Sequence, residues 1–562
     1  MKSIIDYFEN VIKNQSTLTW YFPDTSKYYN VVELYDLSRK YAAKLEKLKL
    51  APQSVVGLIL PNTVEMVAYL YACWYKNLVA VPLRPKSGKF HDYSDFINGC
   101  NNSCNFSLII CEDSTSDESL SSWKANTQLN IMRAQEVSNI DTIVPATKIK
   151  NNPHDLAVIQ FSSGSTGFPK GVIVNHEMMI TQLGHLERPI RENQLNSRIK
   201  TNASWMPINH DLGIFSGVLM PIFVGSDNIL ATQEYYMRKP ARWFQLLAEH
   251  KVELTFTTNA AIAVALRSIK RLYGQENTDL SHLNLYITAE KISATILRKT
   301  RERLAPLGLS SGQIHSAYGM AENALGASIS RTDKTYILRI AVNDDNKILL
   351  VDESYANSLE LVSVGPAHIN HTFSIRNDLD NILPELYLGE INIESDCLTP
   401  GYLNQPEITK EKLADGRFRT GDLGFLHNGL LYFYGRKDDL MIYNGRNIVP
   451  EDIEETVENL EFVRHSASAI FAWENTMTGL MGLHLVVEGN ASDSPQLNFE
   501  KECVIRETVA EKHDVTLTKV YFCSKGSIEK TSSGKKRRKV VKKRLLSGTL
   551  DIFKSEEESL YA

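Results

Sequence analysis

Short apolar runs alternate with helical patterns through the first 430 residues of the chain. The run at 55–60 (VVGLIL) stops at a Pro-Asn pair, as a buried strand does. Residues 64–74 follow with helical periodicity, and 78–82 (LVAVP) form the next strand-like run. Further runs of this kind lie at 108–110 and 254–257. The alternation predicts parallel sheets covered by helices, which is the α/β class.

After about residue 385 the pattern changes to short strands and turns, as at 429–435 (GLLYFYG). A charged stretch at 436–439 (RKDD) follows and is typical of a domain boundary. The chain is far too long for one hydrophobic core, so several subdomains are expected. We predict a large N-terminal body over 1–435, a compact α+β domain over 436–548 and an acidic tail over 549–562.

Composition places the chain among ordinary globular proteins. Hydrophobic residues make up 43% and charged residues 23%, which excludes collagen-like and wholly disordered classes. The net charge of -5 gives no general reason to expect nucleic acid or a membrane surface. The local exception is basic, because ten of the 61 Lys and Arg residues fall between Lys525 and Arg544. No stretch reaches the ~18 uninterrupted apolar residues of a membrane span, so no stable membrane insertion is expected.

The cysteines favour a reducing compartment. There are seven in the chain, sparse and odd in number, which suits the cytoplasm better than an export route. Cys100, Cys104 and Cys111 lie close together, but a fourth ligand with finger-like spacing is missing, so we interpret them as buried thiols rather than a zinc site. The N-terminus carries acids where a signal peptide needs an apolar core. We therefore expect a cytoplasmic protein.

The strongest local motif is a loop at 161–171 (FSSGSTGFPKG) that follows a strand-like run at 156–160. Glycines let backbone N–H groups converge, hydroxyls donate hydrogen bonds and a lysine neutralises charge, which together suit a phosphate. The loop lacks the Gly-Lys-Ser/Thr ending of the Walker form. A flexible Ser/Gly linker is the alternative. The residues expected to bind phosphate are Ser163, Gly164, Ser165, Thr166, Gly167 and Lys170.

This loop resembles the phosphate loop of the adenylate-forming superfamily, which contains acyl-CoA synthetases, luciferases and peptide-synthetase adenylation domains. Further family motifs occur in the family's order over nearly the whole chain. The resemblance implies a body of two α/β sheets plus a β-rich subdomain, with a small mobile C-terminal domain. It also implies ATP as a substrate, with Mg2+ bound beside its phosphates.

Several motifs are similar to the nucleotide site of that family. The segment 318–322 (YGMAE) resembles the adenine-and-magnesium motif, with Tyr318 and Gly319 at the nucleotide and Glu322 as the metal ligand. A tyrosine can stack on a purine, and a carboxylate is a ligand that Mg2+ accepts. Ala289 and Glu290 lie in a segment similar to the family's adenine wall. Without this context, Tyr-Gly-x-x-Glu would be an ordinary turn into a helix.

The remaining nucleotide contacts and the hinge follow from later motifs. Asp422, in 419–424 (RTGDLG), resembles the ribose-binding aspartate, since two carboxylate oxygens match the two donors of a diol. Arg436 is expected to reach the ribose too, and Asp438 lies at the family's hinge position. Lys535, in 531–535 (TSSGK), resembles the catalytic lysine that stabilises charge in the transition state. Each of these residues could otherwise be a plain turn or surface charge.

Four features favour one branch, the fatty acyl-AMP ligases. Residues 204–213 (SWMPINHDLG) resemble that group's motif, with His210 at the junction of the acyl and nucleotide sites in a positioning role. An insertion at about 330–360 is what such ligases carry, and in the family it impedes the movement that CoA thioesterification needs. Asn447 stands where CoA-using relatives usually place a basic residue, and 361–365 (LVSVG) matches the group's pattern.

We therefore predict ATP-dependent activation of a fatty acid to an acyl-adenylate with release of pyrophosphate. The acyl group is then expected to pass to the phosphopantetheine of an acyl carrier protein supplied in trans. The alternative is a fatty acyl-CoA synthetase. A basic run without interleaved aromatics is weak support for nucleic-acid binding, so none is expected. Residues 536–544 are interpreted as a basic surface for an acidic carrier or for water.

Overall fold

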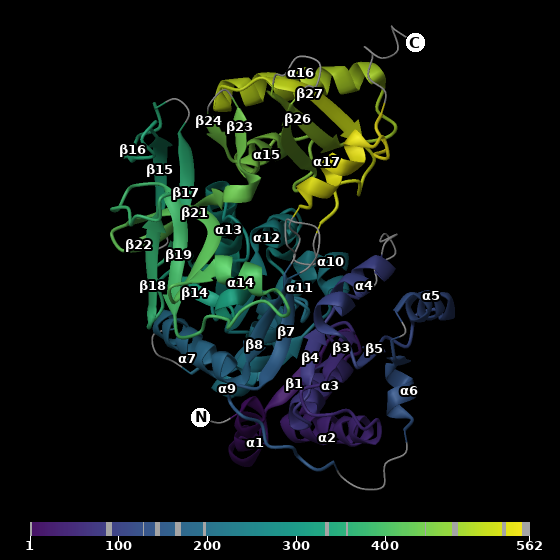
Figure 1. Cartoon of the computed structure of the whole chain (residues 1–562). Coiled ribbons are helices and arrows are strands. Elements are labelled where there is room, and N and C mark those ends of the chain that lie inside the picture. The colour runs from purple at the N-terminus through teal and green to yellow at the C-terminus, as the bar shows by residue number, and fades with distance from the viewer. Residues whose placement is uncertain are drawn as a thin grey trace.

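The computed structural model describes residues 3–85, 93–127, 129–140, 146–162, 170–194, 198–331, 336–355, 358–443, 446–474, 481–530 and 536–553. Two helix-covered sheets and one antiparallel sheet form a body, and a smaller C-terminal domain follows (Figure 1). In Figure 1 this domain lies above the body in yellow and light green, and the first helices lie at the lower end in purple. The predicted class, α/β with an α+β C-terminal domain, is confirmed.

The first sheet has the strand order β6-β5-β3-β4-β7-β8. Neighbours pair in parallel except β7 and β8, which are antiparallel. The predicted β-α-β unit at its centre is confirmed, because β3 and β4 pair in parallel on either side of α3. The strands are β3 (Val55–Ile59), β4 (Val79–Pro82), β5 (Leu108–Cys111), β6 (Ile131–Arg133), β7 (Leu156–Ser162) and β8 (Lys170–Asn175).

Helix α3 (Val64–Tyr75) is apolar almost all round because both of its sides are covered. Thr63 caps the helix by accepting a hydrogen bond from the Met66 N–H. Trp74 Nε1 donates to the carbonyl of Ala157 in β7 at 2.9 Å, which ties the helix to the sheet. Against α2 (Val31–Lys47), Tyr69 of α3 stacks on Tyr41 with 4.2 Å between ring centroids. A helix packed between a sheet and a second helix has no face that needs polar residues.

The second sheet has the order β14-β13-β12-β11-β9-β10-β1-β2. It is parallel from β13 to β1, and the antiparallel strands β14 and β2 form its two edges. The run predicted at 254–257 is its strand β11. The strands are β1 (Thr19–Phe22), β2 (Lys27–Asn30), β9 (Thr201–Ser204), β10 (Asp227–Leu230), β11 (Leu254–Thr258), β12 (Asn284–Thr288), β13 (Ile314–Gly319) and β14 (Gly326–Ile329).

Helices connect the strands of both α/β sheets. Beside α2 and α3 they are α1 (Ile4–Asn14), α4 (Tyr93–Cys104), α5 (Asp117–Thr127), α6 (Ala134–Ser138), α7 (His176–Asn193), α8 (Asp211–Ile214), the π-helix η1 (Phe215–Leu219), α9 (Met220–Val224), α10 (Gln233–Arg238), α11 (Pro240–Glu249), α12 (Asn259–Leu266) and α13 (Ala294–Leu304), with 3-10 turns η2 (Ile269–Leu272), η3 (Ala305–Leu307), η4 (Ser311–Gln313) and η5 (Ala321–Asn323). Within the described ranges, no helix has the length and apolar character needed to cross a membrane. Cys100, Cys104 and Cys111 are free and buried, as predicted.

The third sheet is antiparallel, with the order β16-β15-β17-β22-β21-β19-β18 and β20 beside β21. Its outer strands β15 and β16 belong to the segment expected to be the insertion. Their buried side chains Ile340 and Ile348 pack in one cluster with Tyr434 and Val449. The elements are β15 (Ile337–Val342), β16 (Ile348–Leu350), β17 (Leu359–Gly365), β18 (His371–Arg376), β19 (Gly389–Ser395), α14 (Pro406–Lys412), β20 (Leu413–Ala414), β21 (Arg417–His427) and β22 (Leu430–Arg436).

The C-terminal domain follows the short helix η6 (Lys437–Asp439). Its three-stranded sheet pairs β25 with β26 in antiparallel and β26 with β27 in parallel orientation. Lys291 Nζ in the body lies 2.5 Å from Asp452 Oδ1 in α15, so this helix contacts the body through an ion pair. The elements are β23 (Met441–Tyr443), β24 (Arg446–Ile448), α15 (Pro450–Glu458), β25 (Ser468–Glu474), β26 (Met481–Glu488), α16 (Pro495–His513), β27 (Leu517–Cys523) and α17 (Arg538–Leu546).

Two residues of the basic run belong to the core of this domain, so interpreting 536–544 as a surface is wrong for them. Lys536 Nζ lies 2.7 Å from Glu454 Oε2 and 2.6 Å from Glu458 Oε1. Arg538 donates two hydrogen bonds of 2.7 Å to the Glu454 carboxylate. Glu454 is 1% exposed. Buried charges persist only where such partners are present, and the run therefore holds α17 on α15.

The packed chain also extends past the expected start of the acidic tail at 549. Leu550 is buried in a cluster with Val541 of α17. Ile552 forms a β-bridge with Cys523, and the Phe553 N–H donates to the Phe522 carbonyl at 2.8 Å. Residues 549–553 are thus part of the C-terminal domain. The acidic residues 556–558 lie outside the described residues.

Replacing Glu454 by Gln should destabilise the C-terminal domain by about 3 kcal/mol. Arg538 and Lys536 would lose the buried carboxylate that they share, and would keep Glu451 and Glu458 as close countercharges. Burial alone raises the pKa of Glu454, but these two cations outweigh it and lower the pKa to about 2. The carboxylate therefore stabilises the fold fully above its ordinary pKa of 4.5, and the effect is lost as pH falls toward 2.

Hydrogen exchange of β25–β27 at neutral pH measures this loss. Glu461→Gln is the matched control, since Glu461 is exposed just past the end of α15. The difference between E454Q and the parent should shrink between pH 4.5 and 2, because Gln resembles the protonated acid. Equal protection of β25–β27 in E454Q and E461Q at neutral pH would contradict the role assigned to Glu454.

Candidate active site

Several of the residues predicted from the sequence follow the carboxyl ends of parallel strands in the second sheet. β12 ends directly before Ala289, and β13 ends at Gly319. β9 is followed by the segment that contains His210. In open α/β sheets, ligands bind in the crevice outside such strand ends. The candidate site is therefore at this edge, where the second sheet meets the antiparallel one.

Tyr318 and Asp422 join the two sheets at this edge. The Tyr318 hydroxyl donates to Asp422 Oδ2 at 2.7 Å, and both residues are buried. Burial and the adjacent carboxylate raise the pKa of Tyr318, so the phenol keeps its proton. Arg436 lies opposite Asp422 in the β21–β22 pair, with its Nε 3.3 Å from Asp422 Oδ1. The structure thus brings together three predicted nucleotide residues that are far apart in the chain.

Glu322 lies in η5, immediately after the strand that carries Tyr318. The Tyr402 hydroxyl donates to Glu322 Oε1 at 2.7 Å, and the Thr399 N–H donates to the Glu322 carbonyl at 2.7 Å. Burial raises the pKa of Glu322, whereas Tyr402 and Arg436 oppose the rise. Tyr402 therefore sets the direction of the carboxylate, and Arg436 acts electrostatically on both Asp422 and Glu322.

The predicted phosphate loop joins β7 to β8. The two strands are antiparallel, and Ser162 pairs with Lys170 across the ends that the loop connects. Lys170 Nζ is 5.7 Å from the centroid of the Tyr402 ring, so it lies beside the residue that holds Glu322. The remaining predicted residues of the loop lie outside the described residues: Ser163, Gly164, Ser165, Thr166 and Gly167. Their role stays a prediction.

The predicted adenine wall contains two residues with roles in the fold itself. Ala289 has a φ of +73°, a left-handed conformation that is uncommon outside glycine and typical of functional sites. The Glu290 carboxylate accepts a hydrogen bond from the Ala260 N–H at the start of α12. At Gly319, a Cβ would lie 1.9 Å from the Leu325 carbonyl oxygen, so only glycine fits. These contacts shape the edge against which a flat ring could lie.

His210 is the N-cap of α8. The Leu212 N–H donates to His210 Nδ1 at 3.4 Å, and this Nδ1 is 2.5 Å from Asp211 Oδ1. Asp211 is a further negative charge that raises the pKa of Glu322, after the larger effect of burial. A Cβ on Gly213 would lie 2.0 Å from the Pro207 carbonyl oxygen, so the turn closes on itself tightly.

The predicted hinge residue Asp438 is exposed in η6. Before Asp438 in the chain, Arg436 forms an ion pair with Asp422 in the body. After it, Asp439 Oδ2 lies 3.7 Å from Arg538 Nη1 in the C-terminal domain. The connection thus runs between an ion pair in the body and one in the small domain. Rotation at Asp438 stays a prediction.

Lys535 lies outside the described residues, but both ends of its segment are described. Lys530 and Lys536 form a β-bridge, and the Arg537 N–H donates to the Glu529 carbonyl at 2.8 Å. Arg84 follows β4, and charges on both sides of this segment act on it: burial lowers the pKa of Arg84, Arg537 lowers it further and Glu529 opposes them. β4 neighbours β7, whose end leads into the predicted phosphate loop.

Sequence reasoning missed Tyr402, Asp211 and Arg84. Tyr402 belongs to 399–402 (TPGY), a turn-forming stretch that carries no chemical signature of its own. Asp211 directly follows the predicted His210, so the same motif could have predicted it as a second polar group of the site. Arg84 offers no signal in the sequence, since a lone arginine after a strand is common. Tyr402 and Arg84 gain their place from packing between segments distant in the chain, whereas Asp211 contacts its sequence neighbour His210.

A parallel sheet whose strand ends carry aromatic and acidic side chains, joined to a small second domain by a charged connection, is typical of a two-domain nucleotide-binding enzyme. The chain belongs to the AMP-binding enzyme family, which it matches over residues 9–403. Residues 438–555 match a second family, described as the Disco-interacting protein 2-like AMP domain. The interpretation as an enzyme of the adenylate-forming superfamily is confirmed.

Individual relatives match along almost the whole chain. JamA from Moorena producens, named as a medium-chain-fatty-acid–[acyl-carrier-protein] ligase, is 29% identical over 558 residues, covering 93% of this chain and 90% of JamA. FadD25 from Mycobacterium tuberculosis, named as a fatty-acid–CoA ligase, is 27% identical over 566 residues, covering 95% and 93%. A solved structure from a study of fatty acyl-adenylate ligases of E. coli and L. pneumophila has a TM-score of 0.86 at 25% identity, covering 98% of both chains.

Asp422→Ala should weaken AMP binding about 10–100-fold, because a buried carboxylate that accepts hydrogen bonds contributes about 1.5–3 kcal/mol. Asp415→Ala is the matched control on the turn before the same strand, where the side chain is 78% exposed. Calorimetric titration with AMP measures both dissociation constants, and circular dichroism checks the fold. An AMP affinity that is equal in the two variants would remove Asp422 from the site.

Proposed function

We propose that this enzyme uses ATP to convert a fatty carboxylate into an acyl-adenylate and then passes the acyl group to an acyl carrier protein. The observation that carries the first half is the convergence of Tyr318, Asp422 and Arg436 beside Glu322 at one strand edge. The names of JamA and of the fatty acyl-adenylate ligase structures support a fatty acid as the substrate.

The nucleotide is bound across this edge. Asp422 and Arg436 take the ribose hydroxyls, and the Tyr318 ring offers its face to the adenine. The ring centroids of Phe433 and Tyr318 are 6.0 Å apart, so the Phe433 ring packs against the tyrosine ring. Ala289, Glu290 and Gly319 supply the wall of the adenine pocket. The loop from Ser163 to Lys170 takes the phosphates that leave.

Glu322 would hold the Mg2+ that accompanies ATP. A carboxylate with one oxygen fixed by Tyr402 matches the hard oxygen ligands that Mg2+ prefers. When bound, the ion neutralises phosphate charge. Tyr402 contributes by keeping the carboxylate directed to one place, and Lys170, beside the Tyr402 ring, adds a positive charge at the same end of the site.

The reaction forms a bond between a carboxylate oxygen of the fatty acid and the α-phosphorus. The bond between the α-phosphorus and the bridging oxygen to the β-phosphate breaks, and pyrophosphate leaves. Lys535 neutralises the charge that builds at the α-phosphate in the transition state. Glu529 and Arg537, on either side of the segment that carries it, act on the pKa of Arg84, which follows β4, the neighbour of β7. This electrostatic link supports the arrival of Lys535 at the phosphates.

The fatty chain is bound beside the turn of His210. The segment from α8 through η1 to α9 follows this turn directly, and its residues 211–222 are buried. A π-helical turn such as η1 is rare and occurs frequently at functional sites. His210, held by Asp211, separates the acyl site from the nucleotide and positions the carboxylate.

The acceptor is an acyl carrier protein rather than CoA, because the insertion is packed into the domain junction. There it impedes the movement that transfer to CoA needs. Ile340 and Ile348 of the insertion share one buried cluster with Val449, and Leu440 packs against it. These last two residues flank β23 and β24 at the start of the C-terminal domain. The domain must also release the Lys291–Asp452 contact in order to rotate at Asp438. Transfer to CoA is the second candidate, since a relative is named as a CoA ligase.

Lys535→Ala should lower the rate of acyl-AMP formation about 10²-fold or more, because one contact to developing charge is lost. AMP binding should stay unchanged, since the lysine acts on the reacting centre. Lys525→Ala is the matched control, as Lys525 is an exposed cation of the same basic run. Release of pyrophosphate in the presence of ATP, Mg2+ and a fatty acid is the measurement. Full activity in K535A would refute the proposed mechanism.

The acceptor can be identified with the unaltered enzyme. Acyl-AMP made from ATP, Mg2+ and fatty acids of graded length should persist when CoA is added and disappear when a phosphopantetheinylated carrier protein is added. The same carrier without phosphopantetheine is the control, because it lacks the thiol. Mass spectrometry of the acylated products is the measurement. Rapid formation of acyl-CoA would establish the second candidate instead.

A further inference from the structure

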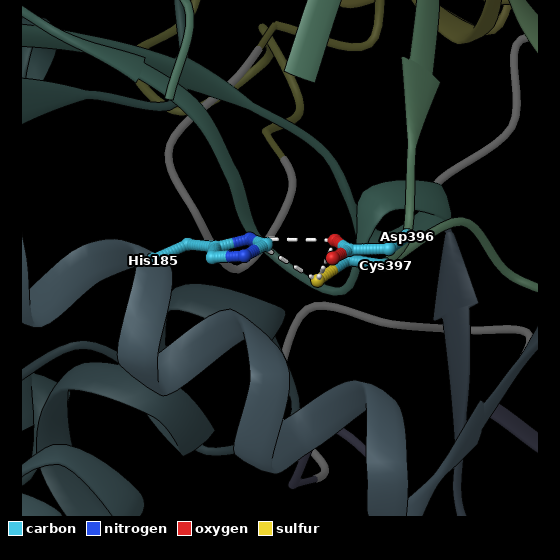
Figure 2. A group of neighbouring side chains, drawn as sticks. All are labelled: His185, Asp396 and Cys397. Carbon is cyan, nitrogen blue, oxygen red and sulfur yellow. Dashed lines mark hydrogen bonds and ion pairs between the residues drawn. The ribbon is translucent and has the colours of Figure 1, made fainter. Parts of the chain in front are cut away.

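A cluster of side chains that could ligate a metal lies outside the candidate nucleotide site, in the segment just before Thr399, the residue that donates to the Glu322 carbonyl. His185 projects from α7 toward Asp396 and Cys397, which follow β19 (Figure 2). His185 Nδ1 is 3.5 Å from Cys397 Sγ and 3.6 Å from Asp396 Oδ1. Cys397 Sγ is 3.6 Å from the same Oδ1. One nitrogen, one sulfur and one oxygen thus form a nearly equilateral triangle.

The size of this triangle fits a tetrahedral cation. With bonds of about 2.3 Å to sulfur and about 2.0–2.2 Å to nitrogen and oxygen, tetrahedral angles place ligand atoms about 3.3–3.6 Å apart. The three measured separations are 3.5, 3.6 and 3.6 Å. A hydrogen bond between two of these atoms would not by itself bring the third to the same distance. The triangle therefore has the shape of one face of a metal tetrahedron.

The ligand atoms are held in place by neighbours. The Asn370 amide donates to Asp396 Oδ2 at 3.0 Å, which leaves Oδ1 directed at the thiol. The Cys397 N–H donates to the Ser395 Oγ at 2.9 Å and fixes the turn that carries both residues. Such outer partners orient ligands in known metal sites. The Asp396 side chain is 44% exposed, so a cation can enter from solvent on that side.

A second observation is a group of buried polar atoms beside the cluster. Gln182, one helical turn before His185, and Asn323 both donate to the Gly326 carbonyl, at 3.1 and 2.7 Å. In the described part of the chain, Gln182 Oε1, Asn323 Oδ1 and His368 Nε2 are buried without a hydrogen-bond partner. Buried polar atoms of this kind need water or an ion. These atoms lie around Gly326, and the rings of His368 and His371 connect that polar interior to His185.

We propose that His185, Asp396 and Cys397 bind one zinc-class divalent cation, with water in the fourth position. The mixture of imidazole, thiolate and carboxylate selects zinc, because Mg2+ and Ca2+ require oxygen ligands and Cu(I) prefers more sulfur. The thiol proton passes to solvent as the sulfur binds the cation. The proposal does not depend on which acceptor the enzyme uses.

The cation stabilises the segment that positions Glu322. Thr399, two residues after Cys397, donates its N–H to the Glu322 carbonyl. On the other side, the His185 ring packs edge-on against His371 with 5.1 Å between centroids, and His371 Nε2 is 2.9 Å from the amide of Asn323, the neighbour of Glu322. Two routes thus lead from the cluster to the turn of Glu322, so this is a positioning site and not a catalytic one.

The test uses the full chain, freed of metal and titrated with Zn2+ or Co2+ alone. One equivalent should bind, and Co2+ should show a thiolate charge-transfer band with the visible bands of tetrahedral cobalt. Cys397→Ser should abolish the charge-transfer band. Cys111→Ser is the matched control, because Cys111 is also buried and its Sγ contacts a carbonyl oxygen, that of Met132. Zinc should raise the melting temperature of C111S and leave that of C397S unchanged.

Two further variants keep the proposal testable if C397S does not fold. Asp396→Asn removes an exposed carboxylate and should fold normally while losing most of its affinity for zinc. Asn370→Ala should raise the zinc dissociation constant about 10–100-fold, as expected for an outer partner. Absence of the charge-transfer band in the parent, unchanged zinc affinity in D396N, or equal zinc effects in C397S and C111S would show a hydrogen-bonded trio without a metal.

Discussion

A buried hydrogen bond from the Tyr318 hydroxyl to the Asp422 carboxylate links the parallel sheet to the antiparallel sheet at the candidate site. A carboxylate is costly to bury, and it is kept here because the phenol donates to one oxygen and Arg436 lies at the other. Both partners come from other strands, so the site exists only when the two sheets meet. This constraint links the proposed nucleotide site to the packing of the two sheets against each other.

The same rule governs the small domain and its junction. Glu454 holds Arg538 and Lys536 in the interior of the small domain, and Asp452 on the same helix meets Lys291 of the body. One helix, α15, therefore carries both the internal ion network and a contact between the small domain and the body. Buried ion pairs are directional and costly to leave half-made, so the junction favours a defined docked position over a loose range of positions.

The sequence predicted the sheets well because their strands are buried on both faces. Runs such as 55–60 read as continuous apolar segments, and parallel pairing follows from the helices between them. The proposed nucleotide residues could be predicted because their motifs resemble those of the family in type and in order along the chain. Tyr402 could not, since its importance comes from one hydrogen bond to Glu322 across 80 positions of the chain. The basic run was misread for Lys536 and Arg538, because charge alone does not tell whether an acidic partner lies nearby.

The sequence by itself determined the α/β class, the family and the chemical types gathered in the site. Apolar periodicity and short motifs involve residues close together in the chain, so they can be recognised in the sequence without the structure. Only the tertiary structure decided which polar groups meet: Tyr402 with Glu322, Arg538 with Glu454, and His185 with Cys397. Contacts over such separations depend on how sheets and domains pack, and their strength depends on burial, which raises the cost of every unpaired charge.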